Sequence, residues 1–385
     1  MNITKNLKDK IFSVVKKKTG LHEPNFDISD IREVSRCIQS SFVSTYGKYV
    51  LEFEKNIKKY TKSKYVIATN SGTSALHIAL KLVGVQKATN VILPTLSFVA
   101  TANAILYNDA LPIFLDSSDK NFCLDEKKLE KFLQNETFSK KNKRYSKHNN
   151  KLISAIVPTH VFGNCCDIEK IIKIGKKYSI PVVEDCAEGL GSFYKNKHLG
   201  TFGDVGILSF NGNKIITSGS GGAIITNSKK KYLEAMHLVT VSKQKHKWRF
   251  FHDKLGWNYR INSLSAALGL SQLKKINKIL NKKKRLHLKY KDIFKDDENF
   301  EFVDFRKINY YKSNFWLNVI RIKSNKISKN KVLDYLNENG IQCRPIWDLL
   351  HTLPYLSKFK NYQIKESEKL FNDVLLLPSS PGLIK

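Results

Sequence analysis

From about residue 64, short apolar runs alternate along the chain with stretches of helical periodicity. Strands are predicted at 64–68, 91–93, 112–115, 152–157, 181–184, 205–208 and 223–226. Helices are predicted between them, at 74–82, 100–107, 125–133 and 168–178. Strands that alternate with helices are typical of a mostly parallel α/β sheet. Because ligands collect at the carboxyl ends of such strands, the polar residues that follow them are the candidates for a functional site.

The second half of the chain changes character. A long helical pattern runs from residue 263 to about 290, and the segments 316–322 and 331–339 then indicate a smaller α+β unit. We expect an N-terminal segment 1–30, a large domain 31–265 and a small C-terminal domain 266–385, since 385 residues exceed one small core. The basic stretch 139–151 interrupts the alternation and is predicted to be an exposed loop.

Composition limits the classes of protein that fit. The formal net charge of +32 suggests nucleic-acid binding, but the lysines are scattered and no nucleic-acid-binding module is present. The charge favours acidic ligands such as phosphorylated substrates. Six cysteines show neither a disulfide framework nor a metal spacing, the N-terminus is too polar for a signal peptide, and no apolar run is long enough to span a membrane. We expect a cytoplasmic protein without a metal site.

One lysine stands just past the end of a predicted strand. Residues 209–222 read SFNGNKIITSGSGG, so Lys214 follows the run 205–208, with Ser209 five residues before it. A lysine in such a place can approach a bound carbonyl group, and partial desolvation makes its amine available as a nucleophile. Since lysine and arginine total 66, an ordinary solvated charge is the alternative interpretation of Lys214 taken alone.

Two further motifs lie between a strand and a helix. In NSGTS (70–74), Gly72 permits close backbone approach and the helix N-terminus offers free N–H groups to an anion. In PTLSF (94–98), Phe98 can stack on a flat ligand. The ordinary alternatives are a helix cap and a core phenylalanine.

Two more motifs carry polar groups without an obvious partner. Asp185 directly follows a predicted buried strand, where a carboxylate needs a charged or hydrogen-bonding partner, and Glu188 comes three residues later. In LGWNYRIN (255–262), Asn258 and Arg260 have no evident local role. A helix cap at Asp185 and a solvent-facing Glu188 are the alternatives.

Together these groups match the needs of pyridoxal 5′-phosphate: a lysine for a Schiff base, a carboxylate for the ring nitrogen, an aromatic for stacking and a phosphate cradle. The ordered motifs GTSAL, PTLSFVAT, VPTHVFG, VEDCAE, SFNGNK and LGWNYRIN resemble those of the DegT/DnrJ/EryC1/StrS family of sugar aminotransferases. The resemblance extends from FVSTYGKYV (42–50) to RPIWDLLH (344–351), and LHEPNF with SFNGNK is most similar to the legionaminic-acid and perosamine branches.

The resemblance assigns expected roles to the site residues. Lys214 forms the Schiff base, Asp185 pairs with the ring nitrogen, Phe98 stacks on the ring and Glu188 approaches the ring hydroxyl. The other assigned residues hold the phosphate or lie near the sugar. They are Gly72, Thr73 and Ser209, with Asn258 from a neighbouring subunit, for the phosphate, and His160, Arg344 and His351 for the sugar. Relatives commonly have glutamate where this chain has Ser220, which weakens the assignment to a subgroup.

The resemblance also implies fold and activity. The expected fold is the aspartate-aminotransferase type, a large α/β domain with a mixed, mostly parallel sheet plus a smaller α+β domain, in a homodimer with shared active sites. The expected reaction transfers an amino group, by way of pyridoxamine phosphate, from glutamate to a nucleotide-linked 4-keto-6-deoxyhexose, for surface polysaccharide or nonulosonate synthesis. The alternatives are a 3-keto sugar substrate and a non-catalytic binding or regulatory protein; a dehydratase of the same family would have histidine in place of Lys214.

Overall fold

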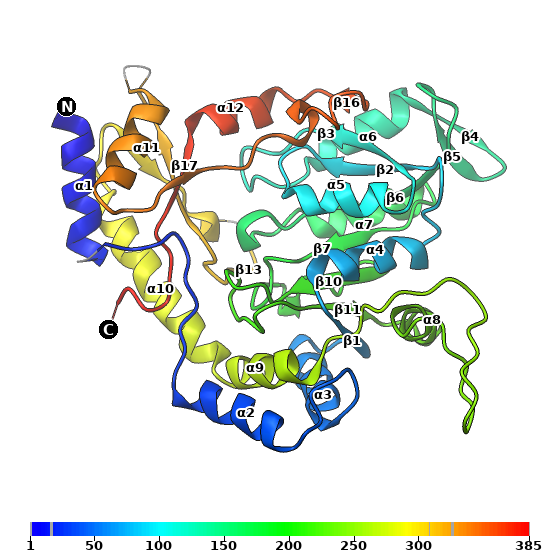
Figure 1. Cartoon of the computed structure of the whole chain (residues 1–385). Helices are drawn as coiled ribbons and strands as arrows, with labels where there is room; N and C mark the ends of the chain where they lie inside the picture. The colour runs from blue at the N-terminus through cyan, green and yellow to red at the C-terminus, as the bar shows by residue number, and fades with distance from the viewer. Residues whose placement is uncertain (1, 16–17, 308, 325–326, 385) are drawn as a thin grey trace.

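A mixed β-sheet forms the centre of the computed structural model, which describes residues 2–15, 18–307, 309–324 and 327–384 (Figure 1). One half has the strand order β1 Tyr65–Thr69, β11 Gly222–Thr226, β10 Val205–Ser209, β7 Val183–Asp185. The other half has the order β6 Ile153–Ile156, β2 Asn90–Pro94, β3 Leu111–Leu115, β16 Asn361–Tyr362. Two parallel bridges, Ile156–Val182 and Thr159–Asp185, join the halves. Only β11 runs antiparallel to its neighbours among these strands, so the predicted mostly parallel sheet is confirmed.

Both faces of this sheet are covered, which explains why its strands are continuous apolar runs. Every residue of β2 and β10 is buried. Successive side chains point to opposite faces, so Leu208 joins one hydrophobic cluster and Ile207 the other. Helices α3 Lys48–Thr61, α6 Glu126–Asn135, α7 Ile168–Lys177 and α9 Ser263–Lys274 pack in the first cluster, and α4 Gly72–Leu82, α5 Val99–Leu106 and α8 Lys229–Val239 in the second.

A third hydrophobic cluster belongs to a smaller unit. It combines α10 Ile276–Ile293, α11 Lys329–Glu338, and the antiparallel strands β12 Phe300–Phe302, β14 Asn318–Ile322 and β17 Val374–Leu377. Helix α1 Asn2–Val15 buries Leu7 and Ile11 in the same cluster. The start of the chain therefore packs on C-terminal elements (Figure 1), whereas α2 Ile28–Gln39 packs against α9. The remaining elements are short: β8 Phe193–Tyr194, β9 Lys197–His198, β13 Tyr311–Lys312, β15 Arg344–Pro345, α12 Lys365–Asp373, and the 3-10 turns Val161–Gly163, Phe305–Lys307 and Leu350–Thr352.

Two sequence-based predictions need correction. The stretch 139–151 is not simply a loop, because β4 Thr137–Lys140 and β5 Lys143–Ser146 form a hairpin in which the Phe138 and Tyr145 rings stack 5.7 Å apart. Its turn residues Lys141 and Asn142 both have positive φ, as in a two-residue type I′ hairpin turn. The single helix expected after residue 263 is divided at Lys275 into α9 and α10. Across the part of the chain described, we find no helix long and apolar enough to cross a membrane.

Candidate active site

The carboxyl ends of β1, β2, β6, β7 and β10 meet at a cavity of about 290 Å³. Parallel strands bring their carboxyl ends to one edge of a sheet, so motifs far apart in the sequence converge there. Seven of the predicted site residues line this cavity: Gly72, Thr73, Phe98, Asp185, Glu188, Ser209 and Lys214.

Lys214 lines this cavity, and its side chain is largely buried. Its Nζ lies 3.1 Å from Glu188 Oε1 and 4.3 Å from the centre of the Trp316 ring, and its side chain is 12% exposed. The Trp316 indole N–H donates to the carbonyl of Asn213, 2.8 Å away, which fixes the ring beside the lysine. The amine is therefore held by a carboxylate and an aromatic face, within reach of a ligand in the cavity.

Glu188 is buried beside Lys214. Its Oε2 accepts a hydrogen bond of 2.7 Å from the backbone N–H of Phe162. Burial raises the pKa of Glu188 to about 7, although the charge of Lys214 opposes the shift. The site thus holds a carboxyl group that changes charge near neutral pH.

Asp185 ends strand β7 and is oriented by hydrogen bonds. The Thr101 hydroxyl donates to its Oδ2 at 2.6 Å, and the N–H of Ala187 donates to its Oδ1 at 3.1 Å. Ser97 hydroxyl contacts link Thr101 to Thr159, at 3.0 and 3.1 Å. Thr101 was not predicted from the sequence, because a threonine in a helix has no local signal for such a role.

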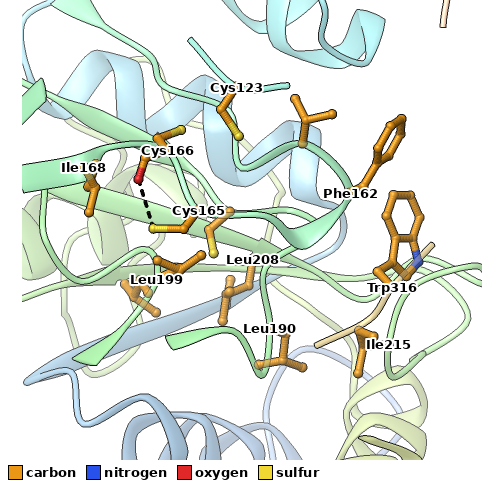
Figure 2. Close-up of a cluster of buried hydrophobic side chains, with 14 of the residues drawn as sticks. Cys123, Phe162, Cys165, Cys166, Ile168, Leu190, Leu199, Leu208, Ile215 and Trp316 are labelled. Atoms are coloured by element: carbon orange, nitrogen blue, oxygen red, sulfur yellow. Dashed lines mark hydrogen bonds between the residues drawn. The ribbon is translucent and has the colours of Figure 1, made fainter. Parts of the chain in front are cut away.

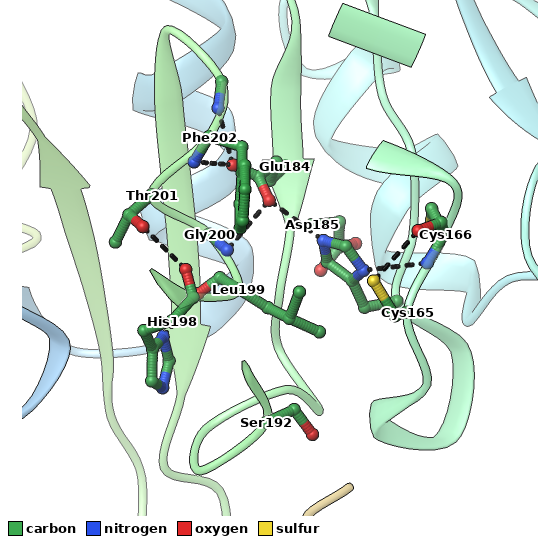
Figure 3. A network of polar contacts seen from close by, with 12 residues as sticks. Cys165, Cys166, Glu184, Asp185, Ser192, His198, Leu199, Gly200, Thr201 and Phe202 are labelled. Carbon is green, nitrogen blue, oxygen red and sulfur yellow. Dashed lines mark hydrogen bonds and ion pairs between the residues drawn. The ribbon is translucent and has the colours of Figure 1, made fainter. Parts of the chain in front are cut away.

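The preceding residue, Glu184, points to the other side of the strand and anchors it (Figure 3). Burial alone favours a high pKa, but hydrogen bonds from His160 and from the N–H groups of Gly203 and Gly200 hold the pKa of Glu184 below its ordinary value. The His160 ring is fully buried, and its Nε2 lies 3.0 Å from Glu184 Oε2. His160 lines neither this cavity nor the larger cavity next to it. The expected sugar contact of His160 is therefore not supported, and the residue supports strand β7.

The start of α4 forms a compact cradle of backbone N–H groups beside Ser209. Ser71 caps the helix through Ser74 N–H, and the N–H groups of Gly72 and Thr73 have no partner among the described residues. A Cβ on Gly72 would come 2.9 Å from the Ser209 Cβ, so only glycine fits without displacement. Free N–H groups at a helix N-terminus beside a serine hydroxyl are suited to a phosphate.

Aromatic rings separate this cavity from a second one of about 730 Å³. Phe98, Trp316 and Trp347 line both, and the Phe98 ring, half exposed, lies 5.8 Å from Trp347. Figure 2 shows Phe162 and Trp316 at one edge of a cluster of buried hydrophobic side chains. Cys165 and Cys166 lie in the same cluster. All six cysteines are free and buried, as expected for small apolar residues.

The remaining predicted residues differ in their placement. Arg344 is exposed and lines the second cavity. His351 lines neither cavity and its Nδ1 lies 2.7 Å from Thr95 Oγ1. Asn258 is exposed outside both cavities, and Arg260 pairs with buried Glu54, which supplies the local role that the sequence did not reveal.

This arrangement fits the cofactor that the motifs imply. The cradle at Gly72 suits a phosphate, Asp185 suits a protonated ring nitrogen, and Lys214 suits a carbonyl carbon. Phe98 offers a half-exposed ring for stacking. Within the described residues, no group of histidine, cysteine and carboxylate side chains could hold a metal ion.

Comparisons with known proteins agree with these motifs. The profile of the DegT/DnrJ/EryC1/StrS aminotransferase family matches residues 24–385. GDP-perosamine synthase of Escherichia coli O157:H7 is 31% identical over 364 residues, 94% of this chain and 93% of that protein. UDP-4-amino-4,6-dideoxy-N-acetyl-beta-L-altrosamine transaminase of Campylobacter jejuni strain 81-176 is 35% identical over 296 residues, 75% of this chain and 72% of that protein.

Among solved structures, the chain is similar to PseC of Helicobacter pylori, an aminotransferase involved in the biosynthesis of pseudoaminic acid. The TM-score is 0.86 and the identity 27%, with 95% of each chain covered.

Proposed function

The chain belongs to the DegT/DnrJ/EryC1/StrS aminotransferase family and uses pyridoxal phosphate, and we propose that it aminates a nucleotide-linked 4-keto-6-deoxyhexose. The observation that carries the reaction type is the convergence of Lys214, Glu188 and Asp185 on one cavity beside the Gly72 cradle. The position of amination is inferred from a relative whose name specifies a 4-amino-4,6-dideoxy sugar with an N-acetyl group. We therefore propose a 2-acetamido sugar.

Bound at the site, pyridoxal phosphate supplies an aldehyde that bonds to an amine and a ring that accepts electrons from the adjacent carbon. The N–H groups of Gly72 and Thr73, with the Ser209 hydroxyl, bind the phosphate. Asp185, held by Thr101, keeps a proton on the ring nitrogen. Phe98 covers one face of the ring and excludes water.

Lys214 would hold the cofactor through its aldehyde carbon, and the free amine of Lys214 would act as a general acid/base. Its Nζ moves a proton at the α carbon of the amino donor, and in the second half of the cycle at carbon 4 of the sugar. Glu188, 3.1 Å from this amine, stabilises its protonated form. We propose glutamate as the donor, because Arg344 and the basic character of the chain suit an anionic amino acid as well as a diphosphate.

We also propose a homodimer in which Asn258 reaches the partner's phosphate. In one subunit Asn258 is exposed and does not line the cavity. The loop before it, 241–256, exposes Trp248, Phe250 and Leu255 by more than three quarters. Apolar side chains gathered on one loop are typical of an interface.

The test is product analysis. Purified enzyme is incubated with glutamate and separate 3-keto and 4-keto nucleotide sugars, with UDP and GDP as carriers, and the new amine is located by NMR. Amination of the 4-keto sugar supports the proposal. Amination of the 3-keto sugar alone would overturn the position while leaving the cofactor unaffected, and binding of cofactor without any turnover would indicate a non-catalytic relative.

A further inference from the structure

His22 lies on the wall of the second cavity, and only one of its ring nitrogens is engaged. Its Nε2 is 2.9 Å from the Lys283 Nζ. Its Nδ1 is buried from solvent and has no hydrogen-bond partner within the described part of the chain. Of the buried side-chain atoms there that lack a partner, this nitrogen alone belongs to a residue that lines either cavity. A buried polar atom without a protein partner at a cavity wall is open to a hydrogen bond with a water molecule or a ligand.

Lys283 is the group that faces the other ring nitrogen of His22. Its amine is fully buried and has three partners: it donates to Trp316 O at 2.9 Å and to Ser379 O at 2.6 Å, and it lies 2.9 Å from His22 Nε2. An ammonium group has three donors and no acceptor, so the three partners match its charged form. Burial lowers the pKa of Lys283, and these acceptors are what a charged amine needs at this depth.

The consequence for His22 is a single tautomer. If Nε2 accepts from Lys283, the proton of the neutral ring is on Nδ1, which becomes a donor. Burial, with the neighbouring charges of Lys283 and Lys214, lowers the pKa of His22 well below its ordinary value, so the ring stays neutral.

The position of His22 relates it to the reactive amine. Its ring centre is 6.3 Å from that of Trp316, whose ring is also 4.3 Å from the Lys214 Nζ. Arg344 lines the same cavity. A substrate that reaches from Lys214 to Arg344 through the second cavity can therefore bring its sugar ring beside His22.

We propose that His22 orients the sugar: Lys283 fixes its tautomer, and the Nδ1–H donates a hydrogen bond to an uncharged oxygen of the substrate, a hydroxyl or an acetamido carbonyl. This inference rests on the proposed function, which places a nucleotide sugar in the second cavity. A neutral donor selects for an acceptor at this point without adding a second charge beside Lys214.

The first test is NMR of protein labelled with ¹⁵N at histidine and tryptophan, with the His22 signals assigned from His22→Phe. Without ligand, His22 should show a protonated Nδ1 and an unprotonated Nε2. UDP-N-acetylglucosamine, which has no ketone to aminate, should then shift the Nδ1 signal together with the indole signals of Trp316 and Trp347. A protonated Nε2, or a charged ring, would overturn the inference.

Titration with UDP-N-acetylglucosamine tests the role of His22 separately from the proposed substrate class. If the indole signals shift and the His22 signals do not, the nucleotide sugar is bound and the role of His22 is wrong. If none of these signals shifts, the proposed substrate class fails, and the inference fails with it.

Matched variants test the role in turnover. His22→Asn places an amide N–H near the position of Nδ1, whereas His22→Gln places it near that of Nε2, since the shorter asparagine side chain carries its amide on Cγ. His22→Gln and His22→Phe should raise KM for the nucleotide sugar about tenfold with a smaller effect on kcat, the size expected for one hydrogen bond. His22→Asn should restore KM toward that of the wild type. Equal KM values in all three variants would contradict the proposal.

Discussion

The Glu188 carboxyl group and the Lys214 amine lie 3.1 Å apart in a site where burial raises the pKa of the acid to about 7. An ordinary glutamate has a value of 4.5, so burial outweighs the attraction of the lysine. The pair therefore makes the reacting amine sensitive to pH, because loss of one proton near neutrality changes the charge that faces Lys214.

The first prediction concerns stability against pH. A raised pKa means that folded protein binds the proton more tightly than unfolded protein, so the associated stability is present below pH 4.5 and lost as pH rises to about 7. Glu188→Gln removes this dependence. The free energy of unfolding of cofactor-free wild type, relative to the variant, should fall by on the order of 3 kcal/mol across this range, measured by urea denaturation. Glu338→Gln, at an exposed position, is the control; parallel curves for wild type and Glu188→Gln would contradict the prediction.

The second prediction tests the Schiff-base lysine. Wild-type protein should be yellow and should lose this colour with borohydride, which reduces the Schiff base. A peptide digest of the reduced protein should then show the cofactor attached to Lys214. Lys214→Ala should lose the absorbance band and turnover, because no other lysine among the described residues lines this cavity. Turnover near that of the wild type in this variant would show that the assignment is wrong.

The sequence predicted the sheet and the main site residues because both depend on local signals. Buried parallel strands are continuous apolar runs, and the residue after a strand end must lie at the sheet edge. Asp185 and Lys214 were identified in this way, whereas Ser209 was assigned by the family resemblance, and all three line the cavity.

The rest of the site depends on contacts between distant segments. Thr101, Trp316 and Trp347 line the cavity, but threonines and tryptophans in helices and loops have no pattern that marks them. His160 belongs to a family motif, but its ring packs against Glu184 and does not line the cavity. The carboxylate of Glu184 is fully buried and therefore requires hydrogen-bond partners, of which His160 is one. The hairpin 137–146 was missed because its charged residues obscure the Phe138–Tyr145 pair.

The third prediction uses two glycines. Gly72→Ala should weaken binding of pyridoxal phosphate at least tenfold, because the new Cβ would lie 2.9 Å from Ser209 and displace the cradle. Gly212→Ala is the matched control, since a Cβ there meets nothing within 4 Å. Absorbance titration of cofactor-free protein gives both dissociation constants, and equal values would refute a cradle at Gly72.

The fourth prediction concerns the Thr101 hydroxyl. Thr101→Val keeps the shape of the side chain but removes the 2.6 Å hydrogen bond to Asp185. Hydrogen bonds to charged groups contribute about 1.5–3 kcal/mol, so cofactor affinity and turnover should each fall about tenfold or more. Thr101→Ser keeps the hydroxyl and should recover most of the loss. If the valine and serine variants behave alike, the hydroxyl does not orient Asp185.

The last prediction tests whether two subunits share each active site. Asn258→Asp places a carboxylate where the proposal requires an amide beside the partner's phosphate, so this variant and Lys214→Ala should each be inactive alone. After subunit exchange, a mixed dimer has one site with both defects and one with neither, and activity should reappear in proportion to the mixed dimers. Exchange is verified by mass spectrometry of differently tagged subunits. If mixed dimers form and stay inactive, Asn258 does not act across the interface, and its exposed position in the single chain needs another explanation.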